Sequence, residues 1–351
     1  MKILLGKKEK ITVKKNENVA CFVDEQTMEM VYQTLKTPYK KGAVMKFENA
    51  FCDSPSVFRW KDEWYMLFIK IDKTTSTSGY ETHLARSKDL LHWEYMYPIL
   101  HRKEDNSWDS KQVAGYAAFV EYDINGGFSL QKINGAYRFA YLGGSLDGYE
   151  TDPLFMGQGE VDDICNPASY CRKDNPVLSP LDKDARKGER LTIYKAYMFQ
   201  DDAKVLGYPY VNAYNAKDVD HKESIFLAVS NDGENWVRYG DKAIIFDDSP
   251  EQDIQINGDP QILKVGDLYV MVYFILQGEK AFNTFACSYD LLHWTKWCGK
   301  PLIESEYEWE DLYAHKPWVV VKDGVLYHYY CAVNNNNERF IALATSDFSN
   351  K

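Results

Sequence analysis

Apolar and polar residues alternate with a period of two over most of the chain, which is the pattern of half-buried β-strands. The alternating segments come in pairs joined by tight turns built on Lys-Asp, Gly-Asp or Asp-Gly, as expected of β-hairpins. Such hairpins cover residues 56–69, 260–274 and 317–330, and residues 133–142 supply the outgoing half of another. The pattern therefore predicts strands rather than helices through this part of the chain.

A second sequence unit repeats along the chain. It reads Ala-x-Ser-x-Asp with a Trp four residues after the Asp, and its copies begin at Ala85, Ala228 and Ala286. A shortened copy begins at Ala344. Each copy is typical of a strand that runs into a Ser-x-Asp turn and is followed by a strand that begins at Trp.

A hairpin followed by this unit makes one four-stranded antiparallel sheet. The copies place such sheets near residues 51–100, 113–165, 190–248, 257–303 and 314–347. Sheets that repeat around a ring leave only short, protected edges. The sequence thus predicts an all-β fold, a five-bladed β-propeller with four antiparallel strands per blade. We expect residues 1–45 to be a lead-in segment or a strand that helps to close the ring, and residues 46–351 to be the propeller domain. Residues 157–190 are expected to be an insertion.

Composition limits the partners of this fold. The net charge of −11 argues against nucleic acid and against an anionic membrane surface. No run of 18 apolar residues and no apolar leader segment is present, so we expect a cytoplasmic protein as given, or a periplasmic or secreted one if a leader was removed. Aromatic residues make up 15%, which suits both sheet packing and carbohydrate recognition, because aromatic rings lie flat against the apolar faces of sugars.

The seven cysteines have no zinc-binding spacing, and free buried thiols are the favoured interpretation. A disulfide between Cys165 and Cys171 remains an alternative, since the two are close in sequence. We expect no metal and no cofactor. Carboxylate groups on the propeller axis could bind Ca²⁺, but the sequence lacks a dense acidic loop of the kind that binds this ion.

The innermost strand of a propeller blade starts beside the axis on the ligand-binding face, so polar residues at these starts are candidates for a central site. The predicted starts carry Asp53, Tyr116, Lys195, Asp259, His315 and Lys316, and the last of these segments continues to Trp318. Asp53 and Asp259 stand in similar proline-containing contexts, and we interpret them as equivalent positions. A carboxylate before a buried strand is costly unless it is paired. The alternative role for either Asp is to cap the entrance of its strand.

The third strand of each blade starts on the same face, further from the axis. The tetrapeptide Gly-Tyr-Glu-Thr occurs twice, with its glutamates at Glu81 and Glu150. Glu223 and Arg339 each lie seven residues before the Ser of their own strand. We expect all four side chains to point toward one mouth, the alternative being solvated or salt-bridged surface positions.

Several of these segments carry a resemblance to a known group of enzymes. They are residues 53–58 (DSPSVF), residues 64–66 (WYM), the Ala-x-Ser-x-Asp repeats and residues 258–260 (GDP). Together they resemble the five-bladed propeller glycosidases of glycoside hydrolase family 43, with families 32, 62, 68, 117 and 130 as relatives. The resemblance spans about residues 45–348. It implies that Asp53 is the general base and that Asp259 resembles the axial Asp that orients the substrate.

Glycoside hydrolysis requires a protonated carboxylic acid beside an ionised carboxylate. Glu223 is our candidate for the acid. His315 is the second candidate, because a resemblance to family 117 implies a histidine that protonates the leaving group. The predicted activity is exo-acting, inverting hydrolysis of a plant, algal or microbial oligosaccharide, and replacing Asp53 with Asn should abolish it. The predicted substrate-binding residues are Glu81, Glu150, Tyr116, Lys195, His315, Lys316, Trp318 and Arg339.

Two alternatives remain at this point. A family 130-like phosphorylase would need a cationic cluster for phosphate, and Lys195, His315, Lys316 and Arg339 are available for it. A propeller that binds carbohydrate without cleaving it is the other alternative. Release of a sugar 1-phosphate, or binding without any product, would identify either one.

Overall fold

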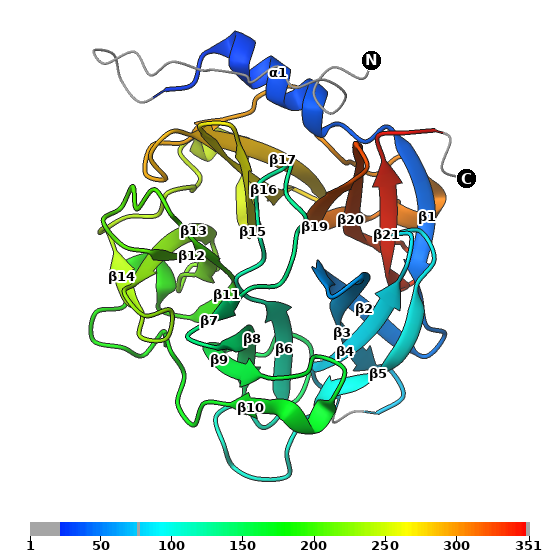
Figure 1. Ribbon diagram of the computed structural model, residues 1–351, viewed down its shortest axis with the longest axis vertical. Helices are drawn as coiled ribbons and strands as arrows, with labels where there is room; N and C mark the ends of the chain where they lie inside the picture. Colours follow the sequence, from blue (N-terminus) through cyan, green and yellow to red (C-terminus); the bar gives the residue numbers. More distant parts are fainter. Residues whose placement is uncertain (1–21, 76–77, 349–351) are drawn as a thin grey trace.

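The computed structural model describes residues 22–75 and 78–348, and its strands pair in four-stranded antiparallel units around one centre (Figure 1). The first unit contains β2 (Ala50–Trp60), β3 (Glu63–Asp72), β4 (Glu81–Ser87) and β5 (Glu94–Leu100). The second contains β6 (Gln112–Ala117), β8 (Ala136–Gly144), β9 (Phe155–Val161) and β10 (Tyr170–Arg172), with the short β7 (Lys132–Ile133) beside β8. The third contains β11 (Thr192–Gln200), β12 (Tyr210–Lys217), β13 (Glu223–Ser230) and β14 (Val237–Tyr239).

The fourth unit contains β15 (Ile254–Val265), β16 (Leu268–Gln277), β17 (Lys280–Ser288) and β18 (Thr295–Lys296). The fifth contains β19 (Tyr313–Lys322), β20 (Val325–Val333), β21 (Arg339–Thr345) and β1 (Tyr39–Met45). Single parallel bridges, Glu223 with Ile256 and Ala281 with Tyr313, join the last three units at their edges. The predicted all-β propeller is confirmed, and the grouping fits the predicted blade count.

The repeated Ser-x-Asp unit is a structural turn. In its first copy the Oγ of Ser87 accepts backbone N–H groups from the two following turn residues, and Oδ1 of Asp89 accepts the N–H of His92 at 2.8 Å. The copies at residues 228–236 and 286–294 make the same contacts. These bonds satisfy backbone donors that would otherwise be unpaired at the end of a strand. The histidines of this unit therefore serve the fold and not the site.

A helix that the alternating pattern did not predict precedes the first unit. Helix α1 (Glu25–Leu35) begins after Asp24, whose side chain accepts the N–H of Thr27 at 2.9 Å and so caps it. Its buried residues recur at the three- and four-residue spacing of a helix face: Met28, Val31 and Leu35. The helix lies outside the ring, beside the fourth unit (Figure 1).

The strand that completes the fifth unit comes from the N-terminal part of the described chain. β1 pairs antiparallel with β21 as the outermost strand of that unit. Lys40 of β1 forms an ion pair with the fully buried carboxylate of Glu310, which also accepts the hydroxyl of Tyr330 at 2.7 Å. Since both charges are paired within the protein, this contact ties the N-terminal strand to the last unit and closes the ring.

One end of the axis is filled by the loop at residues 118–131. Its backbone pairs with the last residues of three innermost strands, at Arg59 of β2, Met198 of β11 and Lys264 of β15. The predicted central site lies at the opposite end, where the same strands begin.

The structure also tests the predicted insertion and the alternative of a disulfide between Cys165 and Cys171. Part of the predicted insertion at residues 157–190 is strand, because it contains the last five residues of β9 and the whole of β10. The six cysteines within the described residues are free thiols, so Cys165 and Cys171 do not form a disulfide. No helix among the described residues has the length and apolar character needed to span a membrane.

Candidate active site

The innermost strands bend where they start. A register shift interrupts β2 between Asp53 and Ser56, and similar shifts interrupt β15 and β19. In these strands the residue before proline has a positive φ: Ser54 at 49°, Asp259 at 53° and Lys316 at 55°. Such backbone is uncommon for residues other than glycine and occurs chiefly where the surrounding structure holds it in place.

This register corrects the predicted equivalence of Asp53 and Asp259. Asp53 occupies the position of Gly258 and His315, the last paired residue before the shift. Asp259 is one residue further along. A displacement of one position along a strand sends the side chain in another direction.

A cavity of about 150 Å³ lies where the innermost and third strands start. Six predicted residues line it: Asp259, His315, Lys316, Glu150, Glu223 and Arg339. Asp53 is not among the lining residues, and its exposed fraction is 0%. The structure thus brings most of the predicted carboxylates and cations together but places the predicted general base behind the cavity wall.

Asp53 is surrounded by donors. Its Oδ2 atom lies 3.0 Å from Nζ of Lys316, 2.7 Å from Nη1 of Arg339 and 3.1 Å from the hydroxyl of Tyr149. Its Oδ1 atom accepts the backbone N–H of Ser54 at 2.7 Å. Burial alone would raise the pKa of Asp53, but the charges of Lys316 and Arg339 outweigh it and hold that pKa well below its ordinary value. Asp53 is therefore ionised at neutral pH and is paired with two cations.

Lys316 connects this anion to Glu150. Its Nζ lies 3.0 Å from Oε1 of Glu150, and that positive charge lowers the pKa of Glu150 against the opposing effect of burial. The loop that carries Glu150 is fastened by its neighbour Gly148, whose N–H donates to the carbonyl of Ser78 and whose carbonyl accepts the side chain of Gln112. Glu150 is therefore ionised and fixed in position.

Glu223 is in the opposite state. It is the first residue of β13, and Nδ2 of Asn215 donates to its Oε2 at 2.8 Å. Burial, followed by the negative charge of Glu150, raises the pKa of Glu223 to about 8. The same Asn215 accepts the backbone N–H of Asp259 at 3.2 Å through its own Oδ1. Glu223 thus carries a proton at neutral pH and lines the same cavity as the ionised Glu150.

Asp259 pairs with Lys195 below the cavity. Their charged atoms are 3.6 Å apart, burial raises the pKa of Asp259, and burial lowers that of Lys195. The ammonium of Lys195 lies over the rings of Trp318 and Tyr116, at 5.0 and 5.5 Å from their centroids. Lys195, Tyr116 and Trp318 are buried and do not line the cavity. The predicted substrate contacts of these three residues are therefore corrected to packing beneath the site.

His315 lines the cavity as a neutral ring. Burial, together with the nearby charge of Arg339, lowers the pKa of His315 to about 3. Its Nδ1 lies 3.1 Å from the carbonyl oxygen of Cys331, which accepts only if that nitrogen carries the proton. A histidine that is neutral at pH 7 is a poor proton donor, so the lowered pKa of His315, and not its position, argues against the second candidate for the acid.

Glu81 is a predicted residue that lines neither cavity of the site. It begins β4 and contacts the ring of His101 and the N–H of Arg102, at 3.5 and 3.2 Å. Glu150, from the second copy of the same tetrapeptide, lies instead in a loop with φ of 49°, ahead of β9. Identical local sequences thus adopt different backbone conformations, because the second copy is held over the axis by tertiary contacts.

Sequence reasoning missed eight lining residues of this cavity: Tyr149, Tyr194, Asn215, Ile256, Phe274, Leu276, Ala281 and Tyr313. The tyrosines lie within two positions of predicted residues, and this adjacency was the signal for them. Asn215 and Phe274 belong to second strands, which run antiparallel to the innermost strands and so end on the ligand-binding face. Considering where second strands end would have identified both.

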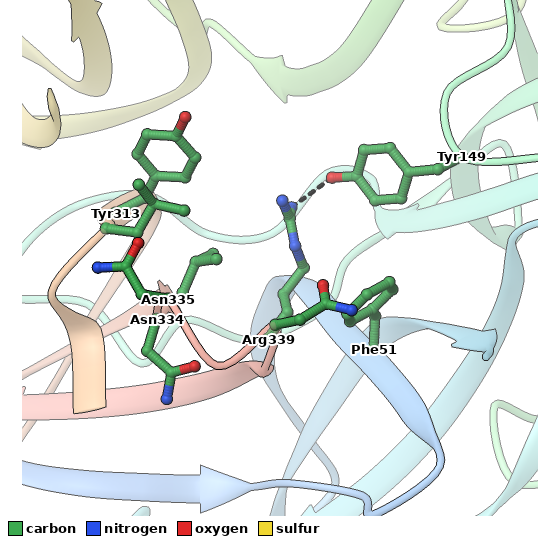
Figure 2. Close-up of a pocket in the computed structure, with 9 residues that line it drawn as sticks. Phe51, Tyr149, Tyr313, Asn334, Asn335 and Arg339 are labelled. Atoms are coloured by element: carbon green, nitrogen blue, oxygen red, sulfur yellow. Dashed lines mark hydrogen bonds between the residues drawn. The ribbon is translucent and has the colours of Figure 1, made fainter. Parts of the chain in front are cut away.

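A larger cavity of about 370 Å³ adjoins the first one (Figure 2). It is lined by Phe51, Tyr149, Leu312, Tyr313, Val333, Asn334, Asn335, Asn337 and Arg339. Tyr149, Tyr313 and Arg339 line both cavities. In Figure 2 the guanidinium of Arg339 extends between the two tyrosines and contacts the hydroxyl of Tyr149. We call the 150 Å³ space the inner cavity and the 370 Å³ space the outer cavity.

Within residues 22–75 and 78–348, no three His, Cys, Asp or Glu side chains are arranged to hold a metal ion. The carboxylates of the inner cavity are instead paired with cations or, for Glu223, with an amide. A cofactor-free site stays a prediction.

Comparison with known proteins decides the family. No protein-family model matches the chain, and no curated protein matches it. A solved structure described as a glycoside hydrolase shares 38% sequence identity with it, with a TM-score of 0.87 over 93% of this chain and 96% of the other. The chain belongs to the β-propeller glycoside hydrolases.

Other solved structures place this glycosidase within the same superfamily. One described as a complex of BT0996 and RGII also shares 38% identity, with a TM-score of 0.87 and coverage of 93% of this chain and 97% of the other. A thermostable family-43 glycoside hydrolase shares 15% identity, with a TM-score of 0.62 over 90% of this chain and 93% of its own. The last likeness concerns the fold alone.

Proposed function

We propose that this glycosidase is an exo-acting hydrolase in which Glu223 is the general acid and Glu150 is the ionised carboxylate opposite it. The observation that carries the proposal is the pair itself. Two glutamates line one cavity, and their surroundings drive their pKa values in opposite directions, up for Glu223 and down for Glu150. Glycoside hydrolysis needs this combination of one protonated and one ionised carboxyl group.

Glu223 is suited to protonate the oxygen of the leaving group. A general acid works best when its pKa lies near the working pH, and a pKa of about 8 keeps Glu223 protonated but ready to release its proton. Asn215 holds the carboxyl through Oε2, which leaves Oε1 for the substrate. After proton transfer the Glu223 anion is buried, and because burial disfavours its charged form it readily takes up a proton for the next turnover.

Glu150 is the partner that acts on the sugar side. Its ionisation is maintained by Lys316, and it either activates a water or attacks the anomeric carbon. Inversion remains the predicted stereochemistry and rests on the family 43 resemblance. In an inverting reaction Glu150 removes a proton from the attacking water while Glu223 donates one to the leaving oxygen, so the enzyme returns to its starting state after one proton exchange with solvent.

Asp53 takes a different role from the one predicted. Its Oδ2 is occupied by Lys316, Arg339 and Tyr149, and its Oδ1 by the N–H of Ser54. A carboxylate so engaged is a weak base. We assign Asp53 the task of orienting Lys316 toward Glu150 and Arg339 toward the substrate.

The size and closure of the inner cavity support cleavage at the end of a glycan. A volume of about 150 Å³ corresponds to about five waters at ~30 Å³ each, which is space for a single sugar ring rather than for a polymer passing through. On the other side, the loop at residues 118–131 crosses between three innermost strands, to which its backbone is hydrogen-bonded. The terminal sugar enters this dead end, and the remainder of the substrate lies outside it. The relative described as a complex with RGII makes an RGII oligosaccharide the first substrate to test.

The cations of the site favour hydrolysis over phosphorolysis. Lys316 is shared by Asp53 and Glu150, Arg339 is bound to Asp53, and Lys195 faces Asp259. A phosphate ion would have to compete with these carboxylates for each cation, at a site that already holds ionised Asp53 and Glu150. The presence of a protonated acid beside an ionised partner also favours a catalyst over a binding module.

The experiment is a screen of nitrophenyl glycosides and of RGII oligosaccharides, with and without phosphate. The proposal predicts release of one free monosaccharide at an unchanged rate when phosphate is added. Proton NMR of the first product reports whether its anomeric configuration is inverted. Formation of a sugar 1-phosphate, or internal cleavage of the oligosaccharide, would contradict the proposal.

A further inference from the structure

The outer cavity is built from residues that suit the hydroxyl groups and apolar faces of a sugar. Its lining combines the amides of Asn334, Asn335 and Asn337 with aromatic and aliphatic side chains such as Phe51 and Leu312. Amides both donate and accept hydrogen bonds, as hydroxyl groups require. Flat aromatic surface adds area without much loss of conformational freedom. Arg339 is its one charged lining residue.

The outer cavity continues directly from the inner one. Tyr149, Tyr313 and Arg339 contribute to the walls of both, and Figure 2 shows Arg339 between the two tyrosines at this junction. A substrate whose terminal ring fills the inner cavity must therefore place the group on the other side of the scissile bond next to these residues.

The asparagines lie on a turn that is held in one conformation. The turn at residues 334–338 joins β20 to β21, and the side-chain oxygen of Asn334 accepts the N–H groups of Asn336 and Glu338, each at 3.1 Å. Asn335 is fastened to Asp311 through its backbone N–H and its side-chain amide, each at 2.9 Å. A fixed turn presents its remaining polar groups without a large entropic cost on binding.

Some polar groups that line the outer cavity have no hydrogen-bond partner within the described residues. The side-chain amide of Asn337 makes no hydrogen bond among residues 22–75 and 78–348, and neither does the hydroxyl of Tyr313. Arg339 uses only its Nη1 atom within that part of the chain, which leaves Nε and Nη2. All three residues line the outer cavity, so the unused donors and acceptors are available to a ligand there.

We propose that the outer cavity is the subsite for the leaving-group sugar, and that this sugar is neutral. The proposal rests on the proposed function, because it places the scissile bond between the two cavities. Asn337 and Arg339 would bind its hydroxyl groups, and the aromatic wall would contact its apolar face. The sugar is neutral because the single cation of the lining is already paired with Asp53. A carboxylate on the sugar would also lie close to the ionised Asp53 and Glu150.

Asn337→Gly removes one side-chain amide from the lining of the outer cavity and so tests the contribution of this lining to binding. Glycine keeps the positive φ of 58° at this position, and the backbone contacts of residue 337 with Asn334 and Lys73 do not involve its side chain. Asn336→Ala is the matched control, since Asn336 is exposed on the same turn but does not line the cavity. Each variant is measured against two substrates, the RGII oligosaccharide that the enzyme cleaves and the nitrophenyl glycoside of its terminal sugar. The second substrate offers no sugar hydroxyls to the outer cavity.

We expect Asn337→Gly to lower kcat/KM for the oligosaccharide about five- to tenfold, the loss of one to two hydrogen bonds, and to leave the nitrophenyl glycoside within twofold. Asn336→Ala should change neither. Equal losses on both substrates, or no loss on the oligosaccharide, would overturn the proposal.

A binding measurement separates this subsite from the catalytic assignment. In the Glu223→Gln background, where turnover is slowed by about 10²–10⁴-fold, calorimetry with the RGII oligosaccharide should show the same five- to tenfold weakening for Asn337→Gly. Undiminished binding, or no binding of the oligosaccharide by the Glu223→Gln enzyme, would overturn the subsite. Intact binding to a wild-type enzyme that forms no product would overturn the proposed function and leave the subsite standing.

Discussion

Replacing Lys316 with Met tests whether this lysine keeps Glu150 ionised. Nζ of Lys316 lies 3.0 Å from carboxylate oxygens of both Glu150 and Asp53, and the lysine side chain is 9% exposed. An opposite charge at such a distance typically lowers the pKa of a carboxyl group by about one to three units. Without it, burial of Glu150 acts unopposed and the pKa of Glu150 rises.

The expected result is a narrower pH profile. Activity requires ionised Glu150, so the acid limb of kcat/KM should move upward by about one to three pH units in Lys316→Met. The alkaline limb follows the pKa of about 8 of Glu223 and should stay near its wild-type position. The loss of a buried cation between two anions should also reduce the free energy of unfolding by about 3–5 kcal/mol.

The control is another buried lysine that pairs with a carboxylate. Lys40, with a side-chain exposure of 4%, forms an ion pair with Glu310, and neither residue lines the inner or the outer cavity. Lys40→Met should lose a similar stability and keep the wild-type pH limits. Stopped assays from pH 4 to 9, with thermal melting to confirm folding, make the comparison. An acid limb that does not move in folded Lys316→Met would refute the reasoning.

Three further outcomes follow from the site. Asp53→Asn should lower the free energy of unfolding by about 3 kcal/mol, measured by urea denaturation. It should reduce kcat far less than Glu150→Gln does, because Asp53 lies behind the wall of the inner cavity. An equal loss of kcat in the two variants would restore Asp53 as the general base. The raised pKa of Glu223 means that the folded protein favours the protonated form of this side chain, so the wild type loses stability as the pH rises from 4.5, the ordinary pKa of a glutamate, to about 8. Glu223→Gln should therefore be more stable than the wild type by about 3–5 kcal/mol at pH 9, but not at pH 4. Equal melting temperatures of the two proteins at pH 9 would argue against the raised pKa. Glu81→Ala should leave kcat/KM within twofold, since Glu81 contacts His101 and Arg102 away from the cavity; a larger loss would place it in the site.

Much of the fold could be predicted from the alternating pattern because each repeat encodes its own turn. The contacts of Ser87 and Asp89 are local, within five residues, so the sequence alone specifies them. Helix α1 was missed because it lies outside the repeats. The closure of the ring through β1 depends on the distant pair of Lys40 and Glu310, which no local pattern indicates.

The position of the site could be predicted from the sequence better than the roles of the residues in it. Glu223 and Arg339 were found because both begin third strands, and strand starts are set by the repeat. Glu81 and Glu150 share one tetrapeptide, yet only the second reaches the axis, since tertiary contacts of its loop decide the outcome. The role of Asp53 depends on which cations surround it, and those come from residues 316 and 339, far along the chain.

The division of labour between Glu223 and Glu150 is tested most directly by changing the leaving group. An acid catalyst contributes about 10²–10⁴-fold when the leaving oxygen needs a proton and little when it does not. Glu223→Gln should therefore lose about that factor on the RGII oligosaccharide and recover most of the wild-type rate on the dinitrophenyl glycoside of the same terminal sugar. Glu150→Gln should remain slow on both substrates. A Glu223→Gln enzyme equally slow on both, or a Glu150→Gln enzyme that the activated substrate rescues, would contradict the assignment.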